Sequence, residues 1–288
     1  MQFIDEYGKN HFNGYKFKEW LTKNNDICIY IAAVYLAFVF IGPSLIEKLM
    51  TLTPGRVKII KKLWMLWNLL LSVFSLYGAL RVTPALISDL RHYGLHGTLC
   101  TFHPEHFYTT EVGFAMGIFA ISKVPEFMDT FFLILTGKRR LPFLSWFHHV
   151  TTYLFVWFAY QEGSSIFVVA ASMNYVVHTI MYFYFALAEA GYKSLVKPFA
   201  MYITLLQILQ MVLGLCTSLY ALYQKYLGDF KPEACPGVSL ANNRVQIIIY
   251  ICNFYLFTEM FVKTYIFVPK RPTCASIVMG REKGLKAE

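Results

Sequence analysis

Charged side chains are scarce in this sequence of 288 residues. Only 15% of the residues are charged, whereas 57% are hydrophobic and 18% are aromatic. A soluble domain of ordinary composition carries about 25% charged residues. The shortage of charge therefore favours a polytopic membrane protein over a soluble one. The net charge of +9 is carried by residues between the apolar runs, so it indicates orientation in a membrane rather than binding to nucleic acid.

Signatures of several other protein classes are also missing. The sequence contains no P-loop, no GxGxxG fingerprint and no cysteine spacing typical of a zinc site. The first 25 residues are polar and include lysines, which is unlike a cleavable signal peptide. We therefore expect the first apolar run to act as the insertion signal. No internal repeat or low-complexity linker divides the chain.

Long apolar runs are what the sequence has in abundance. A helix that crosses a bilayer needs about 20 such residues. Seven runs meet this length, near 26–46, 63–83, 112–136, 142–160, 164–187, 199–222 and 245–268. The sequence thus predicts an all-α membrane domain over 26–268, between a polar tail at 1–25 and a second tail at 269–288. Six spans, with the first run lying on the membrane surface, form the alternative arrangement.

Lysine and arginine are unevenly divided between the two predicted faces. One face carries the loops at 47–62, 137–141 and 188–198 with the C-terminal tail, and holds 15 of these residues, against 8 on the other. The positive-inside rule makes the first face cytoplasmic and places the N-terminus on the far, luminal side. Cys100 and Cys235 are the two cysteines in far-side loops, where an oxidising compartment permits a disulfide. The alternative is two free loop thiols.

Polar residues recur inside the predicted spans at similar depth. His148 lies roughly 10 Å from the cytoplasmic face and His178 roughly 13 Å from it, at 1.5 Å of rise per residue. An ionisable group inside a bilayer faces the bundle interior or a cavity and usually marks function. The candidate residues of this layer are Lys123, Glu126, Asp129, His148, His149, Asn174, His178 and Gln207.

Taken singly, these residues also have structural explanations. Lys123, Glu126 and Asp129 are spaced i, i+3, i+6 on one helix face and can pair among themselves. His178 and Gln207 can form interhelical hydrogen bonds, which are worth about 0.6–2 kcal/mol. The common depth on several helices favours a reaction site over separate structural contacts.

Histidines in this pattern fit either a metal centre or imidazole catalysis. The spans contain only His148, His149 and His178, while the other five histidines fall in the N-terminal tail or in one far-side loop. Ser145, one turn before the histidine pair, is a poor metal ligand. We therefore expect no metal, and an imidazole that acts as acid, base or nucleophile.

Four ordered motifs resemble those of the fatty-acid elongase family, the very-long-chain 3-oxoacyl-CoA synthases of the endoplasmic reticulum. They are KVPEFMDTFFLIL, FLSWFHHVTT, MNYVVHTIMYFYFAL and TLLQILQM, and the resemblance extends from about Trp64 to Tyr265. FSLYGALR and KPFAMYIT are similar to the branch that acts on saturated and monounsaturated chains. One position departs from the family pattern, because Ser145 replaces the first histidine of the HxxHH box.

The resemblance implies a fold and a reaction. Seven transmembrane helices are expected, six of which form a barrel around an acyl tunnel with CoA at its cytoplasmic mouth. The reaction is a condensation of acyl-CoA with malonyl-CoA, with no tightly bound cofactor. Partners would be the lipid bilayer, ketoacyl-CoA reductase and other enzymes of the elongation cycle, and a homodimer is a candidate assembly.

The motif positions suggest a role for each candidate residue. His148 would take the acyl group as an acyl-imidazole. The groups that would position the thioester or stabilise the enolate are His149, His178, Asn174 and Gln207, with Glu126 and Asp129 orienting the histidines. Substrate and CoA would contact Lys123, Lys138, Arg139, Tyr182, Tyr184, Lys270 and Arg271. Positive-inside topology explains Arg139 equally well.

Three alternative functions are considered from the sequence. A non-enzymatic lipid carrier or transporter would bind acyl-CoA without releasing CO₂, and the motif set argues against it. A histidine-box lipid desaturase or hydroxylase would contain iron. A catalytically inactive elongase relative would bind acyl-CoA without condensing it, because Ser145 occupies the first box position. If that position only orients its neighbours, the Ser145 hydroxyl can substitute through a hydrogen bond.

Overall fold

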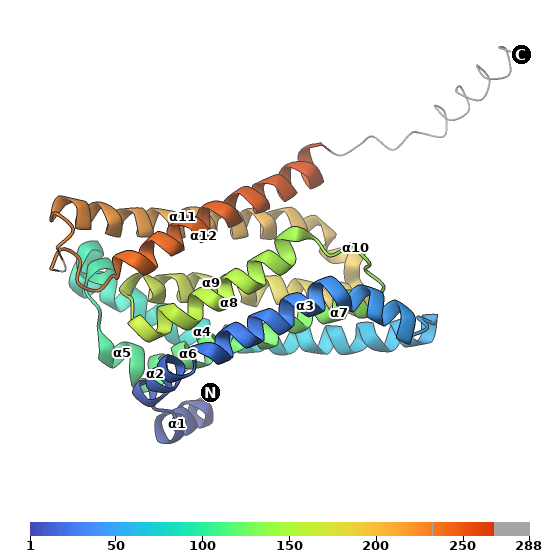
Figure 1. Ribbon diagram of the computed structural model, residues 1–288, viewed down its shortest axis with the longest axis horizontal. Helices are drawn as coiled ribbons and strands as arrows, with labels where there is room; N and C mark the ends of the chain where they lie inside the picture. The colour runs from blue at the N-terminus through green and yellow to red at the C-terminus, as the bar shows by residue number, and fades with distance from the viewer. Residues whose placement is uncertain (232, 268–288) are drawn as a thin grey trace, which may run out of the picture.

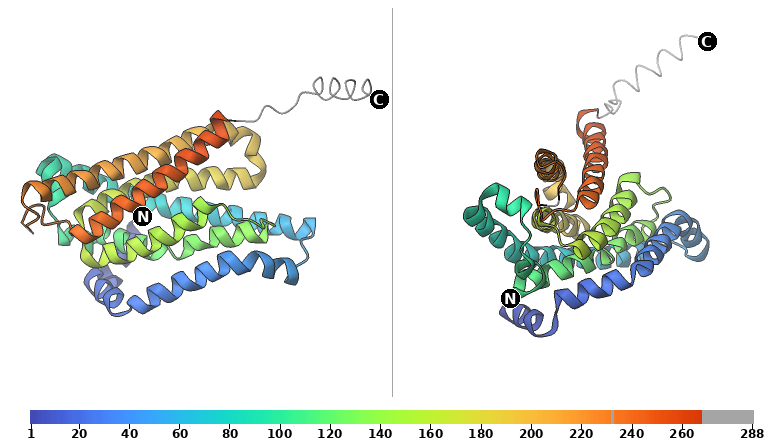
Figure 2. Two further views of the ribbon diagram at one scale, coloured as in Figure 1. Left: turned by 45° about the horizontal axis from the view of Figure 1, so that its top comes forward. Right: turned by 60° about the vertical axis from the view of Figure 1, so that its left-hand side comes forward.

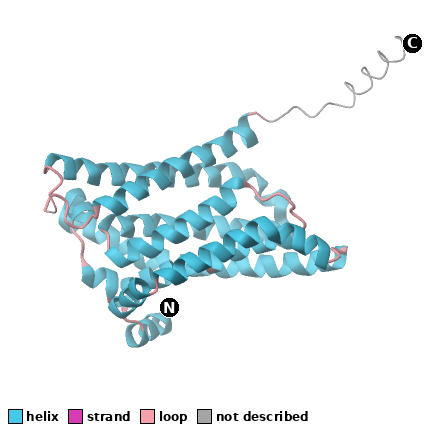
Figure 3. Ribbon diagram, in the orientation of Figure 1, coloured by secondary structure: helices cyan, strands magenta, loops and turns pink. Residues whose placement is uncertain are grey.

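The computed structural model describes residues 1–231 and 233–267, and this part of the chain is helical without any strand (Figure 3). The α-helices are α1 Gln2–His11, α2 Gly14–Lys23, α3 Asn25–Leu49, α4 Pro54–Cys100, α5 Pro104–Tyr108, α6 Thr110–Ser122, α7 Met128–Leu135, α8 Phe143–Glu162, α9 Ser165–Leu187, α10 Lys193–Val196, α11 Ala200–Leu227 and α12 Leu240–Phe261. Shorter 3₁₀ or π turns are η1 Pro125–Phe127, η2 Ala188–Tyr192, η3 Lys197–Phe199 and η4 Val262–Ile266.

Four segments are long and apolar enough to cross a membrane, namely Asn25–Leu49, Pro54–Cys100, Ser165–Leu227 and Leu240–Ile266. The third contains two helices, α9 and α11, which lie as separate rods joined through α10 (Figure 1). The all-α, multi-pass membrane architecture is therefore confirmed. The number of seven spans stays a prediction, because α8 and the broken pair α6 and α7 are not among these four segments.

The long helices run lengthwise beside one another, and their connections gather at two ends (Figures 1 and 2). One end holds the N-terminal helices α1 and α2, helix α5 and the connection between α11 and α12. The opposite end holds the turn between α3 and α4, the connection between α7 and α8, and helix α10. Helix α3 lies along the bundle beside α7 and α8 and does not cross its end. This arrangement disfavours the alternative in which the first run lies flat on the surface.

Helix α4 is much longer than the apolar run at 63–83 predicts. It has 47 residues, and it takes in most of the segments at 47–62 and 84–111 that were predicted as loops. The Thr53 hydroxyl accepts from the Arg56 amide, and Pro54 follows at the first helical position, where its missing N–H has no cost. Gly94 interrupts the helical geometry near the other end, with φ at +65°. Hydropathy reveals only the apolar part of a helix, so its polar ends were missed.

The predicted span at 112–136 is broken rather than continuous. Helix α6 ends at Ser122, the turn η1 begins at Pro125, and α7 begins at Met128. A proline inside a helix has no N–H to donate and its ring clashes with the carbonyl four residues earlier. At this point the Val124 amide donates to the Ile121 carbonyl, three residues earlier, instead of following the regular α-helical pattern. The break lies within the segment that carries the polar motif.

The residues predicted as an N-terminal tail are helices docked on the bundle. The Asp5 carboxylate accepts hydrogen bonds from the Tyr77 hydroxyl at 3.0 Å and from Arg81 Nη2 at 2.6 Å. The Trp157 indole donates to Asn25 Oδ1 at 3.0 Å, where α3 begins. The sequence suggested a tail because short amphipathic helices lack an apolar run.

The outer surface of the bundle is apolar and exposed, whereas its interior is closely packed. Large apolar side chains such as Val34, Phe40 and Leu70 are exposed on the outside of the bundle, as a bilayer requires. In the interior, α4 and α9 approach closely at Gly78, where an added Cβ would lie 2.1 Å from the Tyr175 ring. Small residues allow such contacts between membrane helices.

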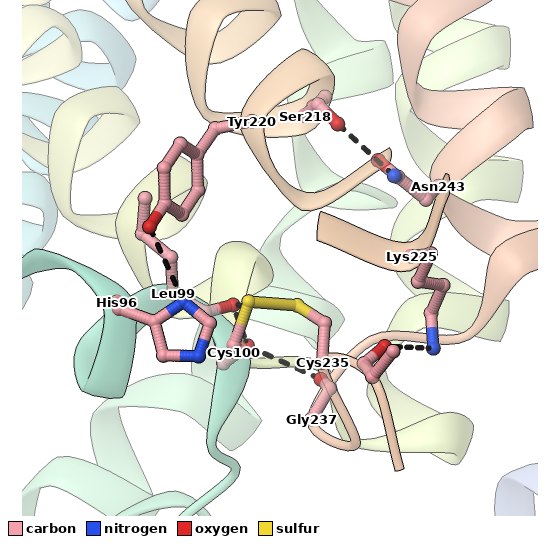
Figure 4. Close-up of a disulfide and its surroundings, with 11 residues drawn as sticks. His96, Leu99, Cys100, Ser218, Tyr220, Lys225, Cys235, Gly237 and Asn243 are labelled. Atoms are coloured by element: carbon pink, nitrogen blue, oxygen red, sulfur yellow. Dashed lines mark hydrogen bonds between the residues drawn. A yellow bond between two sulfur atoms is a disulfide. The ribbon is translucent and has the colours of Figure 1, made fainter. Parts of the chain in front are cut away.

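A disulfide between Cys100 and Cys235 joins the end of α4 to the connection between α11 and α12 (Figure 4). It is the pair that loop placement predicts. The Gly237 amide donates to the Cys100 carbonyl at 2.7 Å. The Ser165 hydroxyl, at the start of α9, donates to the Leu99 carbonyl at 2.5 Å. Three segments distant in sequence are thus tied together at one end of the bundle.

Candidate active site

A buried ion pair occupies the break between α6 and α7. Lys123 Nζ lies 2.6 Å from Glu126 Oε1, and the two residues are 4% and 3% exposed. The Ser122 hydroxyl donates to the same carboxylate oxygen at 3.3 Å. Removing one member of such a pair leaves an uncompensated buried charge, which costs about 3–5 kcal/mol. The pairing that the sequence suggested for these two residues is present.

Helix α9 extends this network toward a histidine. Lys123 Nζ also donates to Asn174 Oδ1 at 3.1 Å, and Asn174 Nδ2 lies 3.0 Å from His178 Nε2. Because a lysine ammonium only donates, it fixes the direction of the Asn174 amide, whose Nδ2 then donates to His178. His178 Nδ1 faces Glu126 Oε1 at 3.9 Å. The spacing i, i+4 predicted that Asn174 and His178 share a face, and they do.

His148 approaches from α8 and contacts a residue of α12. Its Nδ1 lies 3.1 Å from Asn253 Oδ1, and the Phe257 ring meets the imidazole edge-on at 6.0 Å between centroids. The Thr152 hydroxyl donates to the His148 carbonyl at 2.6 Å, one turn along α8. His148 is therefore held by polar and aromatic contacts at once.

One cavity brings these groups together. Its walls come from α6, α8, α9, α11 and α12, and its volume is about 60 Å³. Much of its lining is apolar or aromatic, including Phe119, Phe155, Phe167 and Met211. Its polar lining consists of Lys123, His148, Thr152, Asn174, Gln210, Gln246 and Asn253. A largely apolar hollow with a few convergent polar groups is typical of a small-molecule binding site.

Some predicted residues lie beside this cavity rather than in its lining. Asp129 does not join the ion pair, because its Oδ2 accepts from the Tyr182 hydroxyl at 2.8 Å. The Pro125 break accounts for this, since it disturbs the regular i, i+3, i+6 alignment. His149 packs against the rings of His148 and Phe127, at 5.8 and 6.5 Å between centroids.

Neither Gln207 nor Ser145 belongs to the lining of the cavity. The Gln207 amide donates to the Met181 sulfur at 3.1 Å, while Gln210, one turn on, lines the cavity in its place. The Ser145 amide donates to the Pro142 carbonyl, but its hydroxyl has no hydrogen-bond partner among the described residues.

The residues predicted to bind CoA are dispersed. Lys138 and Arg139 are exposed in the connection between α7 and α8, and Arg139 Nη2 pairs with Glu47 Oε1 at 2.5 Å. Tyr184 is half-buried and packs on Phe185, two residues from Tyr182 along α9. The predicted pair Lys270 and Arg271 lies outside the described residues. Lys123 is thus the predicted CoA contact that reaches the cavity.

Helix α12 supplies site residues that the sequence did not single out. Gln246 and Asn253 line the cavity and are 3% and 1% exposed. They share a buried stripe with Asn243 and Tyr250 on the stretch NRVQIIIYICNFYLF of residues 243–257. Successive members of the stripe are three, four and three residues apart, which places their polar groups on one helix face. That periodicity was the signal by which the sequence could have indicated these residues of α12.

Comparison with known proteins places this chain in a family. The model of the ELO (GNS1/SUR4) family matches residues 20–273. "Fatty acid elongase 1" of Trypanosoma brucei brucei (strain 927/4 GUTat10.1) is 48% identical over 274 residues, which cover 91% of this chain and 89% of that protein. The chain belongs to the ELO family. "Fatty acid elongase 1" of Trypanosoma cruzi (strain CL Brener) is 45% identical over 280 residues, covering 92% and 93% of the two chains.

The resemblance drawn from the four motifs is therefore confirmed for this ELO family member. "Fatty acid elongase 2" of T. cruzi, at 41% identity over 277 residues, covers 94% of this chain. Within the described part of the chain, no group of three His, Cys, Asp or Glu side chains is placed to hold a metal ion.

Proposed function

We propose that this fatty acid elongase catalyses the condensation of acyl-CoA with malonyl-CoA, as a very-long-chain 3-oxoacyl-CoA synthase, and that His148 carries the acyl group. One observation supports this most strongly. His148, Lys123 and Asn174 share the wall of a cavity whose remaining lining is largely apolar. A thioester with a long alkyl chain is a ligand of that chemistry, with its reactive carbonyl among the polar groups.

The residues supply distinct functions in a two-stage reaction. His148 attacks the thioester carbonyl and releases CoA, which gives an acyl-imidazole. Decarboxylation of malonyl-CoA then yields an enolate, whose carbon attacks the acyl group. Lys123 and Asn174 both line the cavity, where the Lys123 ammonium and the Asn174 amide nitrogen would donate to the oxygen that develops negative charge. His178 accepts from Asn174 and would hold that amide in place.

Glu126 has a supporting part in this scheme. It compensates the charge of Lys123 at 2.6 Å, so that the ammonium is retained in a buried site. Asp129 and Tyr182 pair with each other beside this network. No tightly bound cofactor is required for a condensation, because the step involves no net reduction.

We also propose a location and an orientation. The end of the bundle with the disulfide would face the oxidising lumen of the endoplasmic reticulum, with the N-terminal helices. The basic end, with Lys138 and Arg139, would face the cytoplasm, where CoA substrates and the other elongation-cycle enzymes, such as ketoacyl-CoA reductase, would be met. A homodimer is part of the same proposal.

The test uses purified protein, a panel of acyl-CoAs and ¹⁴C-malonyl-CoA, with and without a chelator. We expect a labelled 3-oxoacyl-CoA product, release of CO₂ and no effect of the chelator. His148→Ala should abolish the product and any acyl-enzyme seen by intact-protein mass spectrometry. His92→Ala, an exposed histidine outside the site, is the matched control and should retain both.

Three outcomes would contradict this assignment. Activity lost to the chelator and restored by iron would favour a histidine-box oxidation enzyme. An acyl adduct that persists in His148→Ala would overturn the nucleophile. Inactivity with every acyl-CoA, recovered by Ser145→His, would mean that this chain is an inactive relative.

A further inference from the structure

Asn253 is buried against His148 although no motif of the sequence marks it. Its side chain on α12 is 1% exposed, and its Oδ1 lies 3.1 Å from His148 Nδ1. Its Nδ2 donates to the backbone carbonyl of Ile249 at 2.9 Å. Both polar ends of the amide are thus engaged, one by the backbone and one by the imidazole.

These two contacts decide which ring nitrogen of His148 carries the proton. A backbone carbonyl only accepts, so the Asn253 amide must turn Nδ2 toward Ile249 and Oδ1 toward His148. Oδ1 also only accepts, so His148 must carry a hydrogen on Nδ1. In the neutral ring the other nitrogen, Nε2, then has a free lone pair.

We propose that Asn253 is a positioning residue that holds His148 in the Nδ1–H tautomer, so that Nε2 is the nitrogen that attacks the acyl thioester. The inference rests on the proposed function, since it takes His148 as the acyl carrier. An imidazole bonded to the Asn253 side-chain oxygen also has a fixed ring plane, and His148 lines the cavity proposed to hold the thioester.

The step balances without any further reactant. The Nε2 lone pair forms a bond to the thioester carbon, the C–S bond breaks, and CoA leaves as a thiolate with the electron pair. The Nδ1 proton stays on the ring, which now carries one positive charge, so the hydrogen bond to Asn253 becomes charge-assisted. When the enolate carbon attacks the acyl group, the N–C bond breaks and its electron pair returns to Nε2. The original tautomer is then restored.

Helix α12 offers a matched control for this role. Asn243 is also 1% exposed, and its Nδ2 donates to the Ser218 carbonyl at 3.0 Å. Its Oδ1 has no hydrogen-bond partner within the described residues. The two asparagines therefore share residue type, helix, burial and a backbone contact, and differ in the contact with the imidazole.

The first experiment measures the rate of acyl-enzyme formation in a single turnover, together with KM for acyl-CoA. Asn253→Leu should slow acylation by about 10- to 100-fold, the effect of losing a hydrogen bond to a charged group, with KM nearly unchanged. Asn253→Asp keeps an acceptor and should recover most of the rate. Asn243→Leu should lower the thermal midpoint but acylate at the wild-type rate per folded molecule. Acylation of Asn253→Leu at the wild-type rate would overturn the proposal.

A second measurement reads the tautomer of His148 directly in the wild-type protein, so it does not depend on whether an Asn253 variant folds. Wild-type protein labelled with ¹⁵N-histidine gives NMR signals for each ring nitrogen, and His148→Gln identifies those of His148 by their loss. We expect a protonated Nδ1 and a bare Nε2, and the reverse pattern would overturn the tautomer assignment. The two proposals fail separately. An adduct that survives His148→Ala removes the nucleophile itself, whereas a His148 adduct formed at full rate in Asn253→Leu removes only the role of Asn253.

Discussion

Two clusters of buried polar groups differ in what surrounds them. The site cluster of Lys123, Glu126, Asn174 and His178 consists of side chains that contact one another beside a cavity. The end cluster comprises the Cys100–Cys235 disulfide, the Ser165 hydroxyl and the backbone groups of Leu99, Cys100 and Gly237 (Figure 4). It consists mainly of contacts to backbone groups. Both satisfy the requirement that buried polar groups be paired. The cavity beside the first cluster is the feature that the second cluster lacks in the described part of the chain, and it is the reason to propose chemistry for the first.

The largest expected effect comes from breaking the ion pair of the site cluster. Glu126→Gln leaves the Lys123 charge buried without its partner, so we expect a loss of about 3–5 kcal/mol of unfolding free energy and of elongation activity. The double variant Lys123→Met, Glu126→Gln removes both charges and should recover most of the stability but none of the activity. Thermal unfolding in detergent and the ¹⁴C-malonyl-CoA assay measure the two quantities. A double variant with full activity would show that this pair is structural support, as at the other end.

Removing the disulfide should have the opposite result to the double variant, because stability should fall while activity is kept. Cys100 and Cys235 are 135 residues apart in sequence, so their bond restricts a long loop of the unfolded chain. In Cys100→Ser, Cys235→Ser we expect a loss of about 2–5 kcal/mol of stability. Activity per folded molecule should stay at the wild-type level, because the disulfide does not border the cavity that His148 lines. A selective fall in activity at unchanged thermal midpoint would connect the end cluster to the chemistry.

A smaller effect is expected from the hydroxyl of Ser165. It donates to the Leu99 carbonyl at 2.5 Å and lies 3.2 Å from the Gly237 carbonyl. Ser165→Ala leaves a buried carbonyl with fewer donors, which costs about 1–3 kcal/mol. Ser88→Ala, an exposed hydroxyl on α4, is the control and should leave the thermal midpoint unchanged. Equal midpoints for the two variants would show that the end cluster is loosely held.

The smallest effect concerns the N-terminal helix and depends on pH. The hydrogen bond from Arg81 lowers the pKa of the Asp5 carboxyl below its ordinary value, with a further contribution from the Tyr77 hydroxyl. The folded pKa is the lower one, so this stabilisation is present above the unfolded pKa, about 3.9, and is lost as the pH falls through the folded value.

Asp5→Asn should therefore lower stability by about 1 kcal/mol at pH 7, and the difference from the wild type should shrink in acid. Thermal midpoints of both proteins across an acid pH series measure it. A difference that stays constant with pH would assign the effect to packing of α1 rather than to the carboxylate charge.

The sequence by itself determined the class of the molecule. Apolar runs of about 20 residues leave helices as the structure that satisfies every backbone group in lipid. Four ordered motifs identified the family. The spacing of Asn174 and His178 predicted that they share a helix face, because residues three or four apart lie on one side of a helix. Cysteine placement indicated the pair Cys100 and Cys235, since they were the two that fell on one side.

The tertiary structure decided the partners of those residues. Asp129 meets Tyr182 instead of the ion pair, because Pro125 breaks the helix between α6 and α7. Asn253 meets His148 although they are 105 residues apart in sequence. Local periodicity defines the face of a helix, but the neighbour of that face depends on how separate helices pack. The proposed tautomer of His148 depends on the side-chain oxygen of Asn253 on α12, so it is a property of the fold. The histidine motif alone does not specify it.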